Sequence, residues 1–564
     1  MWVLSHPLPD LFILLSALGL SLLIDRAHRD RGEPRTSTFD QIAGKPALCY
    51  FLIGTLAFLG SAAISMIWEF PQPRVHDEFS YLLAADTFSH GKLTNPTHPR
   101  WQHFESFHIL QRPTYASRYP PGQGLVLALG TKISGHPIVG VWLSAAIGSA
   151  AVYWMAKAWL PPSWALLASL LAVLRIGIGA YWSQSYMGGW VAALGGALLF
   201  GGLRRTIDRP SMAHSVALAA GLIVLANSRP FEGLLVALPC AIILLIFMIR
   251  RHLRGHRDNF SLIVLPLSAL LLLNLLWIGA YNKAVTGNPW KLPHQLYLET
   301  YMTAPYFLFQ PPNPRPEYRH QEMARLHTRW EQQFYERQIS LRGWFEEKRL
   351  AMEDLWGFYL GVGLTLPLLL LPLSRRDPWI LLATALWLLY LAAAFATMGR
   401  MPHYSAPLAP LVFLLAAHGV RAAYDSPRWH LVGHHLRRVL PLVCLAILFY
   451  GLVNPNRPRS SPFPSWHLHR ARILKELEVQ GGHHLIIVRY RRNSPPHYPH
   501  EEWVYNEADI DSATVVWARE MARWKNLQLL RYFKNRTVWL LEPDVEEPHL
   551  QRYPGTPAND KAPG

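Results

Sequence analysis

Charged residues are scarce in this chain of 564 residues, at 16% of the sequence. A soluble globular domain carries about 25% charged residues. The deficit lies in apolar stretches separated by short polar segments, and hydrophobic residues make up 51% of the chain. This composition argues against a soluble protein and predicts a chain that lies largely within a lipid bilayer.

Cysteine is also rare. The three cysteines, Cys49, Cys240 and Cys444, all lie within apolar stretches. None of them belongs to a Cys-x-x-Cys pair, the spacing that is typical of metal sites. We therefore expect thiols buried among membrane helices, rather than disulfides or a zinc site.

Acidic residues are outnumbered by basic ones, 37 against 54, which gives a formal net charge of +17. The positive charge is spread over many short segments, whereas a nucleic-acid-binding domain concentrates it on one face. Cytoplasmic loops of membrane proteins are rich in Lys and Arg. Such loops are the simplest interpretation, and a basic pocket for a lipid phosphate is the sharper alternative.

The apolar stretches predict about a dozen transmembrane helices, since each span needs about 20 residues. Gly122–Ile133 is too short to cross alone and is expected to lie at the outer surface or to dip into the membrane. The first stretch lacks a preceding basic segment and a following cleavage site, which indicates an anchor rather than a cleaved signal. The expected spans are Leu8–Ile24, Pro46–Trp68, Pro137–Leu160, Ser163–Ala180, Gly188–Leu203, Met212–Ala226, Phe231–Ile249, Ser261–Tyr281, Gly357–Leu373, Trp379–Ala396, Ala406–Val420 and Val439–Leu452.

Basic segments orient these spans. The segments are Asp25–Lys45, Arg204–Arg205, Arg250–Arg257, Arg375–Arg376 and Arg421–Arg438. They fall on one side of the membrane when the spans alternate, and the positive-inside rule makes that side cytoplasmic. The loops 70–121 and 282–356 and the tail that follows the last span then lie on the outer side.

The tail differs from the rest of the chain in composition. Three short β-rich runs, Leu485–Tyr490, Ala513–Ala518 and Thr537–Leu541, alternate with polar segments of helical or irregular character, such as Arg519–Lys525. This pattern predicts a small α/β domain over 455–545, with a Pro-rich, disordered end over 546–564. The expected fold class is mainly α: a polytopic membrane domain over 1–453 followed by this small domain.

The first outer loop carries the acidic pair Asp77-Glu78, shortly after a span that ends near Trp68. The following residues fit a helix with an apolar face, which Gly91 would end. The pair can be structural, with Asp77 as helix N-cap and Glu78 as a first-turn acid. Alternatively, the carboxylates can bind a hard divalent cation such as Mg²⁺ or Mn²⁺, or take a proton from a hydroxyl.

Three histidines, His98, His103 and His108, lie in the same loop, and the last two flank Glu105 in HFESFH. A zinc site of the HExxH kind needs another spacing. Loop packing or hydrogen bonding to a substrate is therefore favoured over metal binding. Tyr119 begins the turn YPPG, whose simplest role is that of a rigid turn.

The motif DEFSYLLAADTFSHGKLTNP, followed by RYPPGQG, resembles the first outer loop of GT-C membrane glycosyltransferases. It is most similar to bacterial relatives of the protein O-mannosyltransferases (glycosyltransferase family 39) and lipid A aminoarabinose transferases. The resemblance extends to NSRPFEG at 227–233 and, more weakly, to GRMPHYSAP at 399–407. It covers most of the membrane region.

This resemblance implies a GT-C helical bundle that transfers a sugar from a polyprenyl-phosphate-linked donor to a lipid, glycan or protein acceptor. Transfer would take place on the periplasmic face of a bacterial inner membrane. Asp77 would be the catalytic base or a metal ligand, and Glu78 is the second residue of the motif. The family often has another acid between its third and fourth helices, where this chain has SQSY at 183–186. Glu105 or Glu232 could take its place, so they join His103 and Tyr119 as substrate-binding candidates, and metal dependence stays open.

A lipid-phosphate leaving group develops negative charge, which fixed cations stabilise. Arg229 and Arg400 are favoured, because each lies at the outer end of a span beside a proline and can make bidentate phosphate contacts. The same side chains could instead reach lipid headgroups without a catalytic role. The outer-side candidates are Arg112, Arg118, Arg229, Lys291, Arg400 and His403.

The second outer loop, 282–356, is rich in Pro, Tyr and Trp. Loops of this length often cover a site, although an interfacial loop held by aromatic anchors explains the composition equally well. Its part 325–353 suits amphipathic helices at the membrane surface.

Two other functions stay open. A transporter or lipid flippase usually places ionisable residues within its spans, whereas here Arg175 is among the few, so surface chemistry is favoured. A non-catalytic cell-envelope assembly protein is consistent with the missing second acid.

Overall fold

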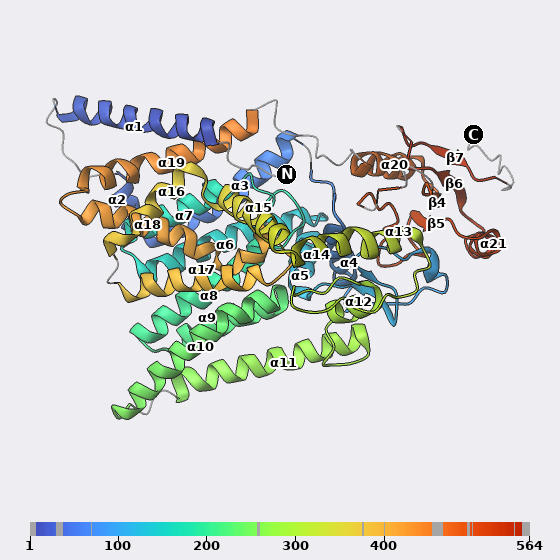
Figure 1. Ribbon diagram of the computed structural model, residues 1–564, viewed down its shortest axis with the longest axis horizontal. Coiled ribbons are helices and arrows are strands. Elements are labelled where there is room, and N and C mark those ends of the chain that lie inside the picture. The colour runs from blue at the N-terminus through green and yellow to red at the C-terminus, as the bar shows by residue number, and fades with distance from the viewer. Residues whose placement is uncertain are drawn as a thin grey trace. The chain divides into compact units, whose positions relative to one another are not determined.

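The computed structural model describes residues 7–29, 38–68, 70–256, 260–374, 377–399, 401–453, 466–492, 497–498, 500–545 and 547–554. It divides into two compact units, and each is built from three separate segments of the chain. Unit 1 contains 1–71, 133–277 and 338–457, and unit 2 contains 72–132, 278–337 and 458–564. Figure 1 shows the helices and strands of both units.

Unit 1 is a bundle of helices. In its core, α8 packs on α6 and α9, α6 packs on α3, and α18 packs on α7 and α19. The helices are α1 (Pro7–Arg29), α2 (Thr38–Ala43), α3 (Pro46–Trp68), α6 (Ile138–Trp159), α7 (Pro162–Ala172), α8 (Gly189–Asp208), α9 (Met212–Ser228), α10 (Pro230–Leu253), α15 (Leu341–Tyr359), α16 (Gly361–Leu369), α17 (Pro378–Phe395), α18 (Ala409–Asp425) and α19 (His430–Val453). Boundaries between segments fall within α5 (Pro121–Ser134), α11 (Leu265–Thr286) and α14 (Gln332–Ile339).

Seven helices of the described residues are long and apolar enough to cross a membrane, or eight if the bent pair Leu341–Tyr359 and Gly361–Ser374 is one span. The expected class, a polytopic helical membrane protein, is confirmed. The count is below the dozen that the sequence predicts. The apolar helices Leu8–Leu23, Pro162–Gly177 and Met212–Ser228 are shorter, and α8, where the sequence predicts the span Gly188–Leu203, is not among the seven. A full crossing needs about 20 helical residues, and α7 continues only as a short π-helical turn, Val173–Gly177.

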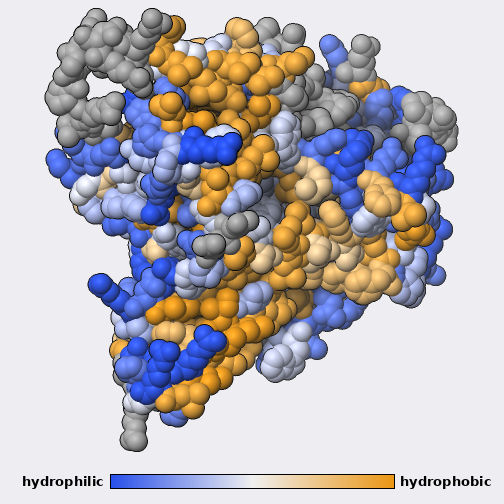
Figure 2. Space-filling view, turned by 60° about the vertical axis from the view of Figure 1, so that its left-hand side comes forward, coloured by the Kyte–Doolittle hydropathy of each residue, from blue (hydrophilic) through white to orange (hydrophobic). Residues whose placement is uncertain are grey.

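The outer helices expose apolar side chains. Figure 2 shows hydrophobic side chains spread widely over one face of the molecule. Large exposed residues include Phe51 and Ile67 on α3, Leu238 on α10 and Leu276 on α11. Nearly all of α18, in contrast, is buried within unit 1. Helices that are apolar on their exposed side suit a lipid environment rather than water.

Glycines let parts of unit 1 approach closely. A Cβ on Gly196 of α8 would lie 1.8 Å from the carbonyl oxygen of Pro407, and one on Gly221 of α9 would lie 2.5 Å from the backbone nitrogen of Leu199. Membrane helices depend on such close van der Waals packing, because lipid offers little hydrophobic driving force between them.

Unit 2 combines helices with two small sheets. β3 pairs antiparallel with β1 and with β2. The second sheet has the order β5-β4-β6-β7, in which β4, β5 and β6 are parallel and β7 is antiparallel to β6. The elements are α4 (His76–Ser89), β1 (Asn95–Pro96), β2 (Ile109–Leu110), β3 (Thr114–Ser117), α12 (Pro293–Tyr301), α13 (Gln321–Arg325), α20 (Trp466–Gln480), β4 (His484–Val488), β5 (Val515–Arg519), α21 (Arg523–Tyr532), β6 (Thr537–Leu541) and β7 (Leu550–Arg552).

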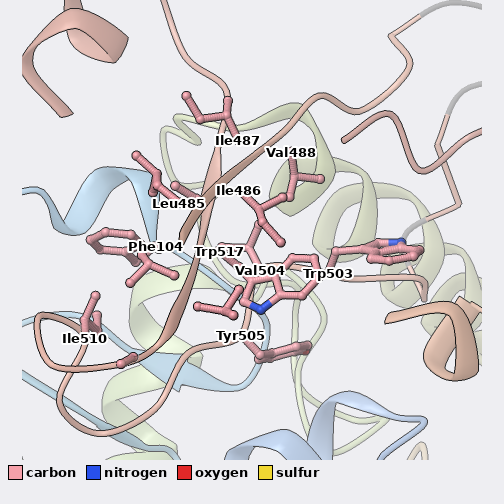
Figure 3. Close-up of a cluster of buried hydrophobic side chains, with 14 of the residues drawn as sticks. Phe104, Leu485, Ile486, Ile487, Val488, Trp503, Val504, Tyr505, Ile510 and Trp517 are labelled. Atoms are coloured by element: carbon pink, nitrogen blue, oxygen red, sulfur yellow. The ribbon is translucent and has the colours of Figure 1, made fainter. Parts of the chain in front are cut away.

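The C-terminal sheet region forms the main core of unit 2. Every residue of β4 is buried, as in parallel strands that are covered on both faces. Figure 3 shows how side chains of β4 and β5 pack with Trp503, Val504 and Tyr505 and with Phe104 of the first loop. The first loop and the C-terminal segment therefore share one core.

Two details of the tail refine the sequence expectation. The segment 519–525, expected to be helical or irregular, begins at the end of β5 and ends within the helix Arg523–Tyr532. Arg519 instead belongs to β5, and its guanidinium is buried against Glu502 and Glu322. The end over 546–564 is not wholly irregular, because Leu550–Arg552 forms β7 and satisfies the edge of β6. Residues 546 and 555–564 lie outside the described part.

We expect Gly196→Ala to destabilise the protein by about 1–3 kcal/mol, since an added methyl group in a tightly packed site forces the backbone apart. The measurement is thermal stability of the purified protein in detergent. Gly19→Ala is the matched control, because a Cβ there meets nothing within 4 Å. Equal melting temperatures for both variants would contradict the described packing of α8.

Candidate active site

The first turn of α4 places Asp77 and Glu78 in different environments. The helix is preceded by Val75 in an extended conformation, so Asp77 is not the N-cap residue. The Oε2 atom of Glu78 accepts hydrogen bonds from the backbone nitrogens of Arg74 (2.8 Å) and Val75 (3.3 Å). This is the backward contact of a capping box, which satisfies backbone donors at the start of a helix. Glu78 therefore stabilises α4.

Asp77 faces a hairpin. Its Oδ1 atom accepts a hydrogen bond from Nδ1 of His108 and another from the Tyr119 hydroxyl, each at 2.5 Å. Burial by itself would raise the pKa of Asp77, but His108, Arg118 and Tyr119 together hold this pKa well below its usual range. The Asp77 side chain is 24% exposed, so it is a charged carboxylate that solutes can reach.

The strands β2 and β3 bring these partners together. Ile109 pairs with Ser117 and Leu110 with Ala116, so the residues just beyond this register, His108 and Arg118, also lie side by side. The backbone nitrogen of Arg118 donates to the His108 carbonyl at 3.3 Å. An antiparallel register thus places His108, Arg118 and Tyr119 at the open end of the hairpin.

His108 has a strained backbone, with a φ of 61°. This left-handed region is uncommon for residues other than glycine and costs about 1–3 kcal/mol when the surroundings impose it. The Ser80 hydroxyl donates to the His108 carbonyl at 2.6 Å, and the His108 nitrogen donates to the Tyr297 hydroxyl at 3.0 Å. Contacts on both sides of the peptide therefore fix the His108 ring against Asp77.

Arg118 is a buried cation beside the carboxylate. Its Nη2 donates to the Tyr119 hydroxyl at 3.0 Å, and its guanidinium lies 5.0 Å and 4.8 Å from the ring centres of Tyr119 and Tyr297. Burial would lower the pKa of Arg118, but the two tyrosines and Asp77 raise it above its usual value. Among the described residues, the Nε of Arg118 has no acceptor, and no carboxylate forms an ion pair with the Arg118 guanidinium.

The C-terminal segment supplies the next contacts. His76 Nδ1 lies 2.9 Å from the Tyr505 hydroxyl, and the Tyr505 ring stacks on Phe79 with centres 4.0 Å apart. The His500 ring is parallel to that of His76 at 5.6 Å. Burial lowers the pKa of His76 well below its usual value and that of His500 to about 4. Both imidazoles are therefore neutral near pH 7.

Glu105 and His103 have partners elsewhere in unit 2. The Glu105 carboxylate accepts a hydrogen bond from the Tyr301 hydroxyl at 3.1 Å and lies 3.5 Å from Arg319. His103 Nδ1 donates to the Arg519 carbonyl at 2.9 Å, and burial lowers the pKa of His103 to about 4. These contacts join the first loop to β5 and α12, which indicates a structural role.

Lys291 is engaged as well, since its ammonium forms an ion pair with Glu299. Arg112 lies over Trp101, with 5.7 Å between its guanidinium and the ring centre. His98 contacts Asp511 at 3.1 Å. None of these contacts reaches Asp77.

Two of the expected phosphate contacts meet in unit 1. The Arg229 guanidinium lies 5.1 Å from the ring centre of Tyr404, and the Tyr404 ring lies 4.6 Å from that of His403. His403 is buried, with Nδ1 2.9 Å from the Tyr181 hydroxyl. Glu232, in the first turn of α10, is also buried. Arg400 lies outside the described residues.

A divalent cation does not fit the acidic pair as the structure has it. Glu78 is turned back to the backbone, and one oxygen of Asp77 is occupied by two donors. Within the described part of the chain, no three His, Cys, Asp or Glu side chains form a group that could hold a metal ion. Hard cations need several oxygen ligands, and the neighbouring Arg118 already supplies positive charge.

Sequence reasoning missed the pairing of His108 with Asp77, 31 residues apart. The histidine was visible in HFESFH, but nothing local indicates its partner. The hairpin register and the positive φ make this contact, and both are set by the fold. Tyr297 lies in the second outer loop, and only the high aromatic content of that loop pointed to it in the sequence.

No protein-family model matches the chain, and no curated protein matches it. Among solved structures, apo ArnT from Cupriavidus metallidurans is 13% identical with a TM-score of 0.47, covering 88% of this chain and 93% of that one. The same protein bound to undecaprenyl phosphate is 12% identical with a TM-score of 0.48, and the match covers 88% of this chain and 92% of that one. An Archaeoglobus fulgidus oligosaccharyltransferase in complex with zinc and sulfate is 12% identical with a TM-score of 0.44, and the match covers 78% of this chain and 59% of that one. These are GT-C membrane glycosyltransferases, the superfamily that the first-loop motif resembles.

We expect Glu78→Ala to lower the stability of the protein by about 1 kcal/mol, as loss of a capping contact does. Glu78→Gln should be close to wild type, because an amide oxygen can still accept from the same backbone nitrogens. Thermal unfolding in detergent, with and without Mg²⁺, measures both. Stabilisation of wild type by Mg²⁺ that disappears in Glu78→Gln would contradict the structural role.

Proposed function

We propose that the protein is a membrane glycosyltransferase that moves a sugar from a polyprenyl-phosphate-linked donor to an acceptor hydroxyl. The observation that carries this proposal is the pairing of Asp77 with Arg118 through a single hydroxyl, that of Tyr119. An anion and a cation are thus held at one reachable place. Transfer of a glycosyl group from a phosphate requires both charges.

The Arg118 guanidinium would stabilise the phosphate leaving group. When the bond between the sugar and the phosphate breaks, the phosphate gains negative charge, and a fixed guanidinium in a buried site stabilises that charge strongly. Arg118 has unused N–H donors among the described residues, and Arg is suited to bidentate phosphate contacts. A buried cation without an ion pair is costly, which supports an anionic ligand as its partner.

The Asp77 carboxylate would help to activate the acceptor hydroxyl. An acceptor hydroxyl becomes a stronger nucleophile as its proton is taken up, so a charged group near it lowers the barrier. Asp77 accepts both of these hydrogen bonds through Oδ1, and Oδ2 has no partner among the described residues. Asp77 therefore belongs to the centre that activates the acceptor, while Glu78 keeps α4 in place.

Within unit 1, the cluster of Arg229, Tyr404 and His403 is proposed as a separate candidate for binding a lipid phosphate. Lys291, held by Glu299, is a weaker candidate. Glu105 and His103 would act on the substrate only indirectly, through the loop that they anchor. We derive no step through Mg²⁺ or Mn²⁺, because the acidic pair does not fit such an ion.

The active centre is assigned to the periplasmic face of a bacterial inner membrane. This assignment is supported by the basic segments, which all fall on the opposite side when the dozen spans expected from the sequence alternate. The small C-terminal domain over 455–545 would then also be periplasmic. The donor sugar, a hexose or a pentose, and the acceptor, a lipid, glycan or protein, are left to the assay.

Asp77→Asn should lower the rate of sugar transfer by about 10²–10⁴-fold, the usual contribution of acid–base groups. The variant should insert and purify as wild type does, because an amide oxygen can still accept from Tyr119. The assay follows release of undecaprenyl phosphate from a panel of undecaprenyl-phosphate monosaccharides, with a cell-envelope extract as acceptor. A rate of sugar transfer by this variant equal to that of wild type would contradict the proposal.

Arg118→Ala should weaken binding of undecaprenyl phosphate at least tenfold, since a charged hydrogen bond contributes about 1.5–3 kcal/mol. Arg118→Lys should recover part of the affinity, because it keeps the charge but not the planar fork. Arg112→Ala, in the same loop but stacked on Trp101, is the control. The measurement is lipid binding to purified protein in detergent, and equal affinities for all variants would argue against Arg118 as the phosphate contact.

A further inference from the structure

We infer that the group which takes the acceptor proton is Nε2 of His108, with Asp77 as the carboxylate that orients the imidazole. This inference rests on the proposed function and assigns the proton transfer to one atom. His108 would be a catalytic residue and Asp77 a positioning residue. The resemblance to the family, in contrast, implies that Asp77 itself is the base.

The hydrogen bond between the two side chains fixes the tautomer. Because the Asp77 carboxylate can only accept, Nδ1 of His108 carries the proton that it donates at 2.5 Å. A neutral imidazole with hydrogen on Nδ1 has a free lone pair on Nε2. Among the described residues, the hydrogen-bond partners of His108's ring are Asp77 and Tyr119, and both contact Nδ1. Nε2 is therefore left for a substrate.

The position of the ring is enforced by the backbone. A φ of 61° is unfavourable for histidine, yet Ser80, Arg118 and Tyr297 hold the peptide groups on both sides of His108. Strain that the surroundings over-determine is common where a side chain must point in one direction. The His108 side chain is 12% exposed, so the described residues do not wholly enclose its ring.

Asp77 is poorly suited to take the proton itself. Two donors and the nearby guanidinium stabilise its anionic form, which keeps the pKa of Asp77 well below its usual range. A base is most effective when its pKa is near the working pH. Burial and Arg118 lower the pKa of His108, while Asp77 and Glu331 oppose them, so His108 is neutral and able to accept a proton near pH 7.

Sugar transfer forms one bond at the anomeric carbon and breaks another. The acceptor oxygen forms a bond to the anomeric carbon of the sugar, and the bond from that carbon to the phosphate oxygen breaks, leaving its electron pair on the polyprenyl phosphate. The acceptor proton moves to Nε2 of His108, which becomes an imidazolium paired with Asp77. Water then takes that proton and restores the neutral ring.

The experiment compares two isosteric substitutions in the full-length protein. In His108→Asn the amide nitrogen replaces Nδ1 and keeps a donor to Asp77, but no base remains at Nε2. In His108→Gln the amide nitrogen reaches the Nε2 position without being basic. We expect both to lose about 10²–10⁴-fold in undecaprenyl phosphate release from the same donor panel.

A third variant, His108→Ala, tests for the base directly. Added imidazole should restore part of its rate, and substituted imidazoles should restore it in order of their basicity, which a purely structural role would not produce. The matched control is His90→Asn, which removes an exposed histidine from another Asp–His pair of α4, with Asp86 at 3.2 Å. That control should keep the wild-type rate.

The outcomes separate the two proposals. If wild type releases no undecaprenyl phosphate from any donor, the proposed function fails. If wild type is active, Asp77→Asn is inactive and folded His108→Asn stays within about threefold of wild type, only the role of His108 fails. If neither Asn nor Gln at position 108 gives a folded protein, imidazole rescue of His108→Ala decides, and its absence overturns the inference.

Discussion

The hydrogen bonds that converge on Oδ1 of Asp77 are the constraint on which the candidate active site depends. They require three chain segments to meet: the first turn of α4, the residue before β2, and the residues after β3. Each segment is fixed by its own local contacts, namely Glu78 at the helix start, the antiparallel register of β2 and β3, and the backbone of His108. A carboxylate that accepts several hydrogen bonds beside a cation stays ionised, and this gives the site its negative charge.

The surroundings of this centre explain why unit 2 is assembled from distant parts of the sequence. Tyr297, from the second outer loop, holds the His108 peptide and lies under the Arg118 guanidinium. Tyr505 and His500, from the C-terminal segment, contact His76, the residue before Asp77. Aromatic and neutral imidazole rings around one anion and one cation lower the local dielectric constant and strengthen the electrostatic interactions between these charges and a substrate.

Much of the helical framework can be predicted from the sequence, because the apolar runs are long and sharply bounded. Pro46–Trp68 is both an expected span and the observed α3. The helix after Asp77 is also found, and it ends at Ser89, with Gly91 at a φ of 71° where a left-handed residue is needed. The strands of the tail are found within two residues, since β-branched runs bounded by polar segments are a strong signal.

The site itself is only half predictable. Asp77 stands out because it follows a span within a recognisable motif, and Arg118 because it precedes a rigid turn on the outer side. Glu78 is next to Asp77 in sequence but points elsewhere, since successive side chains on a helix are about 100° apart. His108 could not be paired with Asp77, because the contact depends on a hairpin register and a strained φ that local patterns do not encode.

The most direct test of the central claim is a cryo-electron microscopy structure of the wild-type protein with undecaprenyl phosphate. We expect a phosphate oxygen within about 3 Å of the Arg118 guanidinium, with the Asp77–His108 contact intact beside it. A phosphate bound elsewhere, with Arg118 making no contact to it, would contradict the assignment of this centre to glycosyl transfer.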